Sequence, residues 1–192
     1  MIKRSFVAFL FIFGLIIFSS VSNADEGDFS FGAALGGVGL TGTDMNQYGS
    51  NGFGYGGYIT YAPSSLLGMD VNVLYSPHSN QGSDANTLYG TVALKTGLYY
   101  DILYPFFTTG VGVYRNSIQL AGGSYSVATF GFNFGGGVDI DLGKNVRIGL
   151  LVRYHPVFDR AISNGSNGIG DLWDALLRIG VLFSTSTQGG WD

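Results

Sequence analysis

The sequence contains no cysteine, only 4 prolines and few charged residues. Without cysteine the chain can build no disulfide scaffold and can carry out no thiol chemistry. Charged residues make up 11% of the 192 residues, whereas about a quarter is typical of soluble domains. The net charge of −4 argues against a nucleic-acid-binding protein, which normally presents a basic face, so no nucleic acid is expected as a partner.

Apolar, aromatic and glycine residues are abundant instead. Hydrophobic residues account for 46% of the chain, which also holds 32 glycines, 12 tyrosines and 15 phenylalanines. This apolar content excludes a disordered chain, and the length allows one domain.

The first 24 residues are typical of a secretory signal peptide. Lys3 and Arg4 supply the positive charge, residues 6–18 are almost entirely apolar, and small residues lead to Ala24. We therefore predict cleavage between Ala24 and Asp25. A transmembrane anchor is the alternative, but the apolar run is shorter than the ~20 residues that span a bilayer. No cysteine follows the run, so a lipoprotein anchor is not available.

The remaining chain reads as eight strands separated by stretches rich in Gly, Ser, Asn, Asp and Pro. The predicted strands cover residues 28–40, 52–62, 67–76, 87–101, 105–116, 127–142, 146–155 and 173–185. Strands of globular proteins average about 5 to 6 residues, whereas a strand that crosses a bilayer at a tilt needs about 9 to 11. The predicted lengths fit the membrane-spanning figure.

Side chains alternate along these strands with a period of two. In residues 146–155 the even positions are apolar or aromatic, while the odd positions include Arg147, Gly149, Arg153 and His155. One face of each strand is therefore apolar and the other polar. A soluble β-sandwich alternates too, but the strand lengths and the aromatic residues near strand ends favour a lipid-facing apolar surface. These aromatic residues are Phe53, Tyr55, Tyr61, Tyr75, Tyr99, Tyr100, Phe107, Tyr114, Tyr154, Trp173 and Phe183.

Long polar connections alternate with short ones along the chain. The predicted long loops are 41–51, 77–86, 117–126 and 156–172, and the short turns are 63–66, 102–104 and 143–145. Outer-membrane barrels have short periplasmic turns and longer external loops. We therefore predict an all-β fold, an eight-stranded antiparallel up-and-down transmembrane β-barrel over residues 25–185. Both termini are expected in the periplasm, with residues 186–192 forming a short periplasmic tail.

Two segments carry the most specific pattern, residues 105–114 and the glycine-rich unit 134–142 that leads into 146–154. With the rest of residues 28–183 they resemble the outer-membrane β-barrel domain of OmpA- and OmpX-type proteins. The resemblance implies a sorting signal in the last strand, read by the barrel-assembly machinery, and assigns it to Arg178, Gly180 and Phe183. The family often ends on an aromatic residue, whereas Thr185 holds the last outward position here. The peptidoglycan-binding domain of OmpA-type proteins is not present in the sequence, so cell-wall anchoring is not implied.

The interior of an eight-stranded barrel is only wide enough to be filled by side chains. The alternation predicts seven inward-pointing charges: Asp70, Lys95, Asp139, Asp141, Arg147, Arg153 and Arg178. A regular hairpin at residues 143–145 places Asp141 opposite Arg147, and Asp70 and Lys95 are a second candidate pair on neighbouring strands. We predict that these charges neutralise one another and plug the lumen. The alternative is a narrow pore for ions or small apolar solutes, gated by the same pairs.

A lipid-modifying enzyme is a more remote alternative. His78 and His155 are expected at outer strand ends or in loops, and His155 with Asp159 or Ser163 offers a base, an orienting acid and a nucleophile. Lipid A deacylases carry a His-x-Ser arrangement in a late strand, and no serine stands at that spacing after His155. No catalytic residue is therefore assigned.

Metal or cofactor binding is not expected either, because the loop acids lack the spacing of a calcium loop. They are scattered one or two per loop, at Asp44, Asp84, Asp159 and Asp171. The sequence predicts an integral outer-membrane protein with a structural or surface-interaction role, in adhesion or envelope integrity. The expected partners are outer-membrane lipids, lipopolysaccharide, the assembly machinery and an unidentified partner of the external loops.

Overall fold

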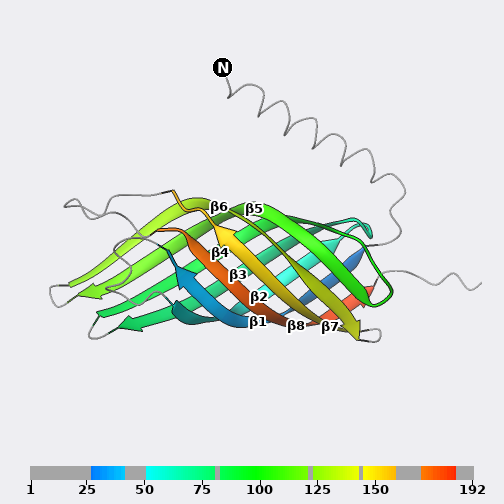
Figure 1. Cartoon of the computed structure of the whole chain (residues 1–192), viewed down its shortest axis with the longest axis horizontal. Coiled ribbons are helices and arrows are strands. Elements are labelled where there is room, and N and C mark those ends of the chain that lie inside the picture. The colour runs from blue at the N-terminus through cyan, green and yellow to red at the C-terminus, as the bar shows by residue number, and fades with distance from the viewer. Residues whose placement is uncertain are drawn as a thin grey trace, which may run out of the picture.

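The computed structural model describes residues 27–41, 51–80, 83–120, 123–142, 145–158 and 170–184. Over these residues the backbone forms eight strands: β1 (Asp28–Leu40), β2 (Asn51–Ala62), β3 (Leu67–Asn80), β4 (Ser83–Gly97), β5 (Leu103–Leu120), β6 (Gly123–Leu142), β7 (Val146–His155) and β8 (Leu172–Ser184). Each strand pairs antiparallel with the next, and β8 pairs with β1 to close the barrel (Figure 1). The predicted fold class is confirmed.

Several predicted features lie outside the described residues. They are the signal peptide with its cleavage point between Ala24 and Asp25, the tail at 186–192, and the loop residues Asp44, Asp159 and Ser163. No helix in the described ranges is long and apolar enough to cross a membrane. The first residue of β1 pairs with the last of β8, Asp28 with Ser184, so the chain enters and leaves the barrel at one end. We call this the terminal end.

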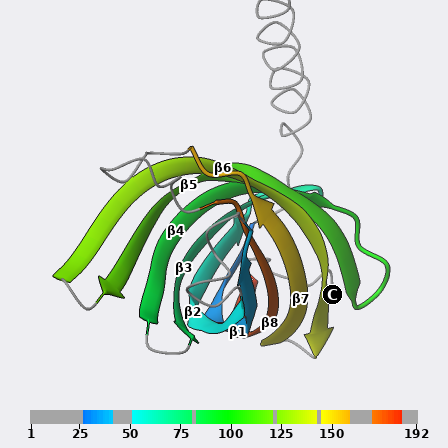
Figure 2. The same cartoon turned by 60° about the vertical axis from the view of Figure 1, so that its left-hand side comes forward.

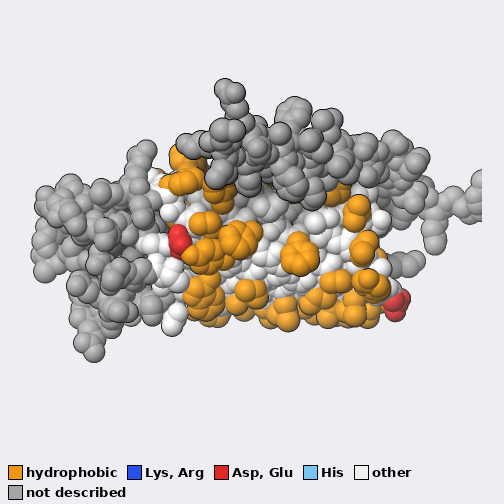
Figure 3. All heavy atoms as spheres, turned by 45° about the horizontal axis from the view of Figure 1, so that its top comes forward, with side chains coloured by type: hydrophobic (Ala, Val, Ile, Leu, Met, Phe, Trp, Pro, Cys, Tyr) orange, Lys and Arg blue, Asp and Glu red, His pale blue; other side chains and the backbone are white. Residues whose placement is uncertain are grey.

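The barrel wall is a single layer, so its two faces have different surroundings. On β7 the side chains of Arg147 and Arg153 are buried inside, while Leu150 and Val152 are each 57% exposed on the outside. The same alternation runs through the other strands, and Figure 3 shows hydrophobic side chains spread over the outer surface. Because no second sheet or helix of the described residues covers this surface, we expect lipid to remove the apolar face from water.

Half of the barrel is longer than the other half. Strands β3 to β6 have 14, 15, 18 and 20 residues, whereas β1, β2, β7 and β8 have 13, 12, 10 and 13. The hairpins β3–β4 and β5–β6 therefore extend to the left in Figure 1, beyond the ends of the other strands, and Figure 2 shows the same extension from another side.

Two of the four predicted long loops are wrong for this reason. Residues 77–86 and 117–126 continue the ladders to Asn80 paired with Ser83 and Leu120 paired with Gly123. Only residues 81–82 and 121–122 separate the strands. Their Ser, Asn and Gln content carries no information on whether the backbone stays paired. The connections between β1 and β2 and between β7 and β8 remain long, as predicted.

The turn after β4 also differs from the prediction. The strand ends at Gly97 rather than at Asp101, and β5 begins at Leu103. Asp101 has a φ of 57°, a left-handed conformation that short polar residues tolerate better than most. The turn is closed by reciprocal backbone hydrogen bonds between Tyr100 and Leu103, at 2.8 and 3.0 Å.

Candidate functional site in the barrel lumen

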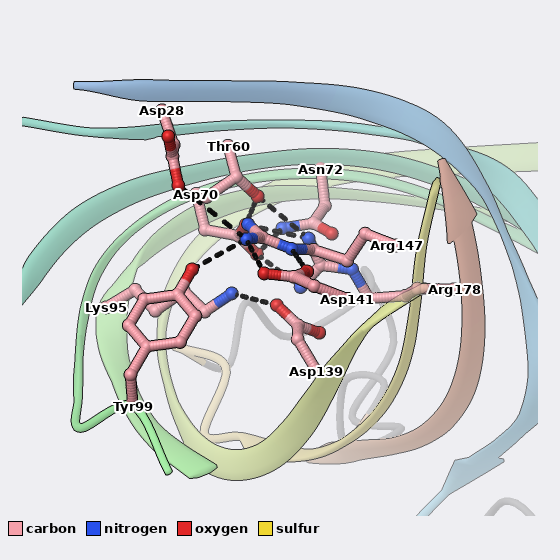
Figure 4. A network of polar contacts seen from close by, with 10 residues as sticks. All are labelled: Asp28, Thr60, Asp70, Asn72, Lys95, Tyr99, Asp139, Asp141, Arg147 and Arg178. Carbon is pink, nitrogen blue, oxygen red and sulfur yellow. Dashed lines mark hydrogen bonds and ion pairs between the residues drawn. The ribbon is translucent and has the colours of Figure 1, made fainter. Parts of the chain in front are cut away.

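The lumen holds two groups of polar side chains. The group nearer the terminal end, which we call the terminal cluster, is drawn in Figure 4. It consists of Asp28, Thr60, Asp70, Asn72, Lys95, Tyr99, Asp139, Asp141, Arg147 and Arg178. The strands bring these residues inward from β1, β2, β3, β4, β6, β7 and β8, and Tyr99 comes from the turn after β4.

The centre of the terminal cluster is a bidentate ion pair between Arg178 and Asp70. Two guanidinium nitrogens of Arg178 donate to the two carboxylate oxygens of Asp70 at 3.1 and 2.9 Å. Asp70 also accepts from the Thr60 hydroxyl and from the Asn72 amide, and Arg178 donates to the Thr60 hydroxyl oxygen at 2.9 Å. The guanidinium stacks on the ring of Tyr58 at 3.8 Å. Both charges are 1% exposed and are satisfied from several sides.

Lys95 forms the second ion pair, with Asp139 of β6. Its ammonium group also lies 3.9 Å from the centre of the Phe106 ring, a cation–π contact. The predicted pairing of Asp70 with Lys95 is therefore wrong. The register of β3 and β4 places Lys95 opposite Gly68 and Asp70 opposite Ala93, and each charge has its partner on a strand that is not its neighbour.

The third pair is Asp141 with Arg147, close to the terminal end. The two residues stand opposite each other in the β6–β7 hairpin. Arg147 donates to both carboxylate oxygens at 2.6 and 2.9 Å and to the Tyr99 hydroxyl at 2.7 Å. Asp141 is 17% exposed and Asp28, 3.9 Å from Arg147, is 26% exposed, so this pair meets water at the rim.

The second group, the distal cluster, lies toward the opposite end and consists of Tyr89, Thr91, Tyr114, Arg153, His155 and Asp174. Its centre is Asp174, which accepts from two nitrogens of Arg153 at 3.1 and 2.7 Å. It also accepts from the Tyr89 hydroxyl at 2.8 Å and from His155 Nε2 at 3.1 Å. His155 Nδ1 then accepts from the Tyr114 hydroxyl at 2.8 Å.

Sequence reasoning missed Asp174, although a signal for it exists. Asp174 has the same parity on β8 as Arg178, which was assigned to the lumen. The seven predicted charges are four cations and three anions, an imbalance that a sealed lumen would not tolerate. Asp174 supplies the carboxylate for Arg153, so each of the four inward cations of the described chain has a carboxylate partner of its own.

The two histidines lie at or near strand ends, as predicted, but both side chains point inward. His155 is the last residue of β7 and is 0% exposed, and His78 lies two residues before the end of β3 and is 2% exposed. The inward direction of His155 agrees with the alternation along β7, which puts it on the same face as Arg153. Tyr114, assigned to the aromatic belt, is instead inside and 1% exposed, because the barrel interior continues to its position.

Two ion pairs, Asp141 with Arg147 and Arg153 with Asp174, join adjacent strands, whereas other polar contacts cross the lumen. Arg178 of β8 reaches Asp70 of β3, Tyr89 of β4 reaches Asp174 of β8, and Arg153 donates to Thr91 at 3.0 Å. In an eight-stranded ring these strands lie on opposite sides. Apolar side chains, among them Tyr58, Leu74 and Leu176, are buried alongside the two clusters. The interior is therefore filled by side chains held to one another, as this barrel size allows.

The residues assigned to the sorting signal lie on both faces of β8. Arg178 and Gly180 are inside, and the position of Gly180 lies so close to the Tyr58 hydroxyl that a Cβ would collide with it. Phe183 is outside and stacks on Phe31 at 5.8 Å. Thr185 is outside the described ranges. In those ranges no group of three His, Asp or Glu side chains is placed to hold a metal ion.

A closed single-layer barrel with an apolar outer wall and paired charges inside defines a transmembrane β-barrel. The sequence matches the family model described as outer membrane protein beta-barrel domain over residues 11–183. The chain belongs to this family and is an outer-membrane protein. A comparison with curated proteins finds no match.

Solved structures with the same fold include several outer-membrane barrels. Neisserial surface protein A has a TM-score of 0.59 and 16% identity, with 82% of this chain and 96% of that chain covered. Ail, the attachment invasion locus protein of Yersinia pestis, has a TM-score of 0.56 and 16% identity, with 83% and 99% covered. OprG from Pseudomonas aeruginosa has a TM-score of 0.56 and 14% identity, with 84% and 97% covered.

Proposed function

We propose that the protein is a closed, non-conducting barrel that displays the hairpins β3–β4 and β5–β6 outside the cell as a surface for contact with other molecules. The observation that carries this proposal is the extra length of strands β3 to β6. About 9 to 11 residues cross a bilayer, whereas β5 and β6 have 18 and 20. The surplus residues lie beyond the membrane as one continuous sheet, because β4 and β5 stay paired as far as Asp84 and Gln119.

The composition of this projecting sheet suits contact in water. Residues 116–126 contain no Asp, Glu, Lys or Arg and are rich in Ser, Asn, Gln and Gly. The pairing of β6 with β7 stops at Phe134 and Tyr154, followed only by a single bridge from Gly131 to Val157. Among the described residues, the outer part of β6 from Gly123 to Ala128 therefore has one strand edge without a neighbouring strand. Such an edge can pair with an extended segment of a partner.

The orientation follows from the same asymmetry. Barrels of this membrane have short turns in the periplasm and longer elements outside, so the terminal end faces the periplasm. The similarity to Ail, the attachment invasion locus protein of Yersinia pestis, and to Neisserial surface protein A supports a surface role. A lipid-modifying activity is not part of the proposal, because His155 is fully buried against Tyr114 and Asp174.

Epitope accessibility tests the orientation. A tag inserted between residues 81 and 82 is expected to bind antibody on intact cells, and a tag after Asp192 only after the outer membrane is permeabilised. The opposite pattern would refute the proposed orientation.

Adherence tests the surface role. Cells producing a variant in which residues 116–127 are replaced by a two-residue turn, which removes nearly all of the free edge of β6, are expected to adhere less to an epithelial monolayer than cells producing the unchanged protein. The matched control shortens the β3–β4 hairpin by the same number of residues, which keeps the free edge of β6. Equal adherence of all three strains, at equal surface levels, would refute a contact role for the β5–β6 hairpin.

Conductance separates the closed barrel from the narrow pore. The purified protein in a planar bilayer is expected to show no conductance, since four ion pairs occupy the lumen. Discrete channel events that change size when Arg153 is replaced by alanine would favour the pore instead.

A further inference from the structure

The side chains on the outer wall of the barrel leave a depression in one place. A hollow with a volume of about 510 Å³ lies on the lipid-facing side of β1, β2 and β3. Its sides are formed by Phe29, Phe31, Ile59, Val71 and Val73, and its floor by the backbone around Gly32, Gly57 and Tyr58. No charged side chain lines it.

A missing side chain creates this hollow. Gly57 occupies an outward position on β2, between Tyr55 and Ile59, which are 53% and 45% exposed. A Cβ at Gly57 would meet only the carbonyl oxygen of Gly32, at 3.4 Å. The position opposite on β1 is the small residue Ala33, and the position opposite on β3 is Val73. The larger outward side chains of Tyr55 and Ile59 therefore project on either side of Gly57, and the backbone at Gly57 is left uncovered between them.

We propose that this hollow, which we call the β1–β3 groove, holds one acyl chain of a membrane phospholipid more firmly than the rest of the barrel wall does. In the bilayer no water is available to fill an apolar depression, and an empty one would forfeit dispersion contacts along its whole lining. The material that surrounds the wall is hydrocarbon, and the groove offers it contacts on several sides rather than on one. The proposal rests on the membrane location of the family and not on the proposed surface role.

The position of the groove along the barrel axis determines which leaflet of the bilayer supplies the bound lipid. Phe29 and Phe31 are among the first four residues of β1, so the groove lies in the half of the wall nearer the terminal end. The chain that enters it therefore belongs to a lipid of the leaflet at that end.

A second copy of the protein is the competing occupant, and the dimensions disfavour it. A stable interface needs roughly 800 Å² and about 20 to 30 residues from each partner. Eight residues line the groove, and the barrel wall around it curves away from any flat partner. An acyl chain needs only the groove itself.

The test fills the groove with a side chain at position 57. Gly57→Leu places a large apolar side chain in the groove, whereas Gly57→Ala adds only a Cβ at ordinary van der Waals distance from its neighbour. The matched control is Gly37→Leu, an outward glycine near the other end of β1 that does not line the groove and whose Cβ would have no neighbour closer than 3.9 Å. Val73→Phe fills the groove from the other side and serves as a second variant should Gly57→Leu assemble poorly.

Delipidated protein in detergent is titrated with palmitoyl-oleoyl-phosphatidylethanolamine, and binding of the first lipid is followed by native mass spectrometry. We expect Gly57→Leu and Val73→Phe to weaken this binding at least tenfold, Gly57→Ala to weaken it slightly and Gly37→Leu to leave it unchanged. Heat-dependent gel mobility verifies that each variant is folded. Equal first-lipid binding by the unchanged protein, Gly57→Leu and Val73→Phe would overturn the proposal. So would a dimer peak that disappears in Gly57→Leu, since the occupant would then be a second copy.

Discussion

The terminal and distal clusters neutralise their buried charges in different ways. In the terminal cluster each of the three cations has a carboxylate of its own, and Asp70 keeps hydrogen bonds from Thr60 and Asn72 besides its ion pair. In the distal cluster Arg153, His155 and Tyr89 all depend on the single carboxylate of Asp174. The terminal cluster distributes its charge neutralisation, whereas the distal cluster concentrates it in one residue. The loss of one side chain should therefore matter most in the distal cluster.

The largest effect is expected for Asp174→Ala. This change leaves Arg153, whose side chain is 0% exposed, without a counter-charge and removes the partner of His155 and Tyr89. Breaking a buried ion pair from one side costs about 3–5 kcal/mol. Reversible urea unfolding in lipid vesicles, followed by gel mobility, measures the loss. The double variant Arg153→Met with Asp174→Leu should recover most of it, and no recovery would mean that the charge pair is not the cause.

Arg178→Met should cost less, although it also breaks a buried pair. Asp70 retains the Thr60 hydroxyl and the Asn72 amide as donors, and the lost cation–π contact with Tyr58 is partly replaced by packing of the methionine. We expect a loss near the lower limit for such pairs, about 3 kcal/mol, in the same unfolding experiment. A loss larger than that of Asp174→Ala would reverse the proposed contrast between the clusters.

Gly149→Ala probes the terminal cluster without removing a charge. A Cβ at this position collides with a carboxylate oxygen of Asp139, so the carboxylate must shift relative to Lys95. Overpacking of this kind costs about 1–3 kcal/mol. Gly37→Ala is the matched control, because its Cβ would have no neighbour closer than 3.9 Å on the outer wall. Equal stability of the two variants would show that Asp139 has room to move.

The smallest effect is expected for Asp141→Asn. This carboxylate is 17% exposed at the rim, and its pair with Arg147 is screened by water and salt. The loss should be at most about 1 kcal/mol and should shrink further at high salt. Unfolding measured at low and high ionic strength provides the comparison, and a large loss independent of salt would place Asp141 among the fully buried pairs.

The alternation in the sequence predicted the inward set of charges well, but not their partners. Asp141 and Arg147 stand opposite each other in one hairpin, and this pair could be inferred from local register. Arg178 and Asp70 are 108 residues apart and meet across the lumen, which no local pattern reveals. The length of the outer hairpins was also missed, because residues 77–86 and 117–126 are polar whether their backbone is paired or not.

Sequence alone determined which face of each strand meets lipid, since successive side chains point to opposite sides of a sheet and the pattern is visible in any short window. It also determined that the sheet closes, because an open edge is not tolerated within the bilayer. Only the tertiary structure decided which charges pair across the barrel, how far β3 to β6 continue beyond the membrane, and where the outer wall is hollow at Gly57. These features depend on the register and curvature of all eight strands together, which place residues from distant parts of the chain side by side.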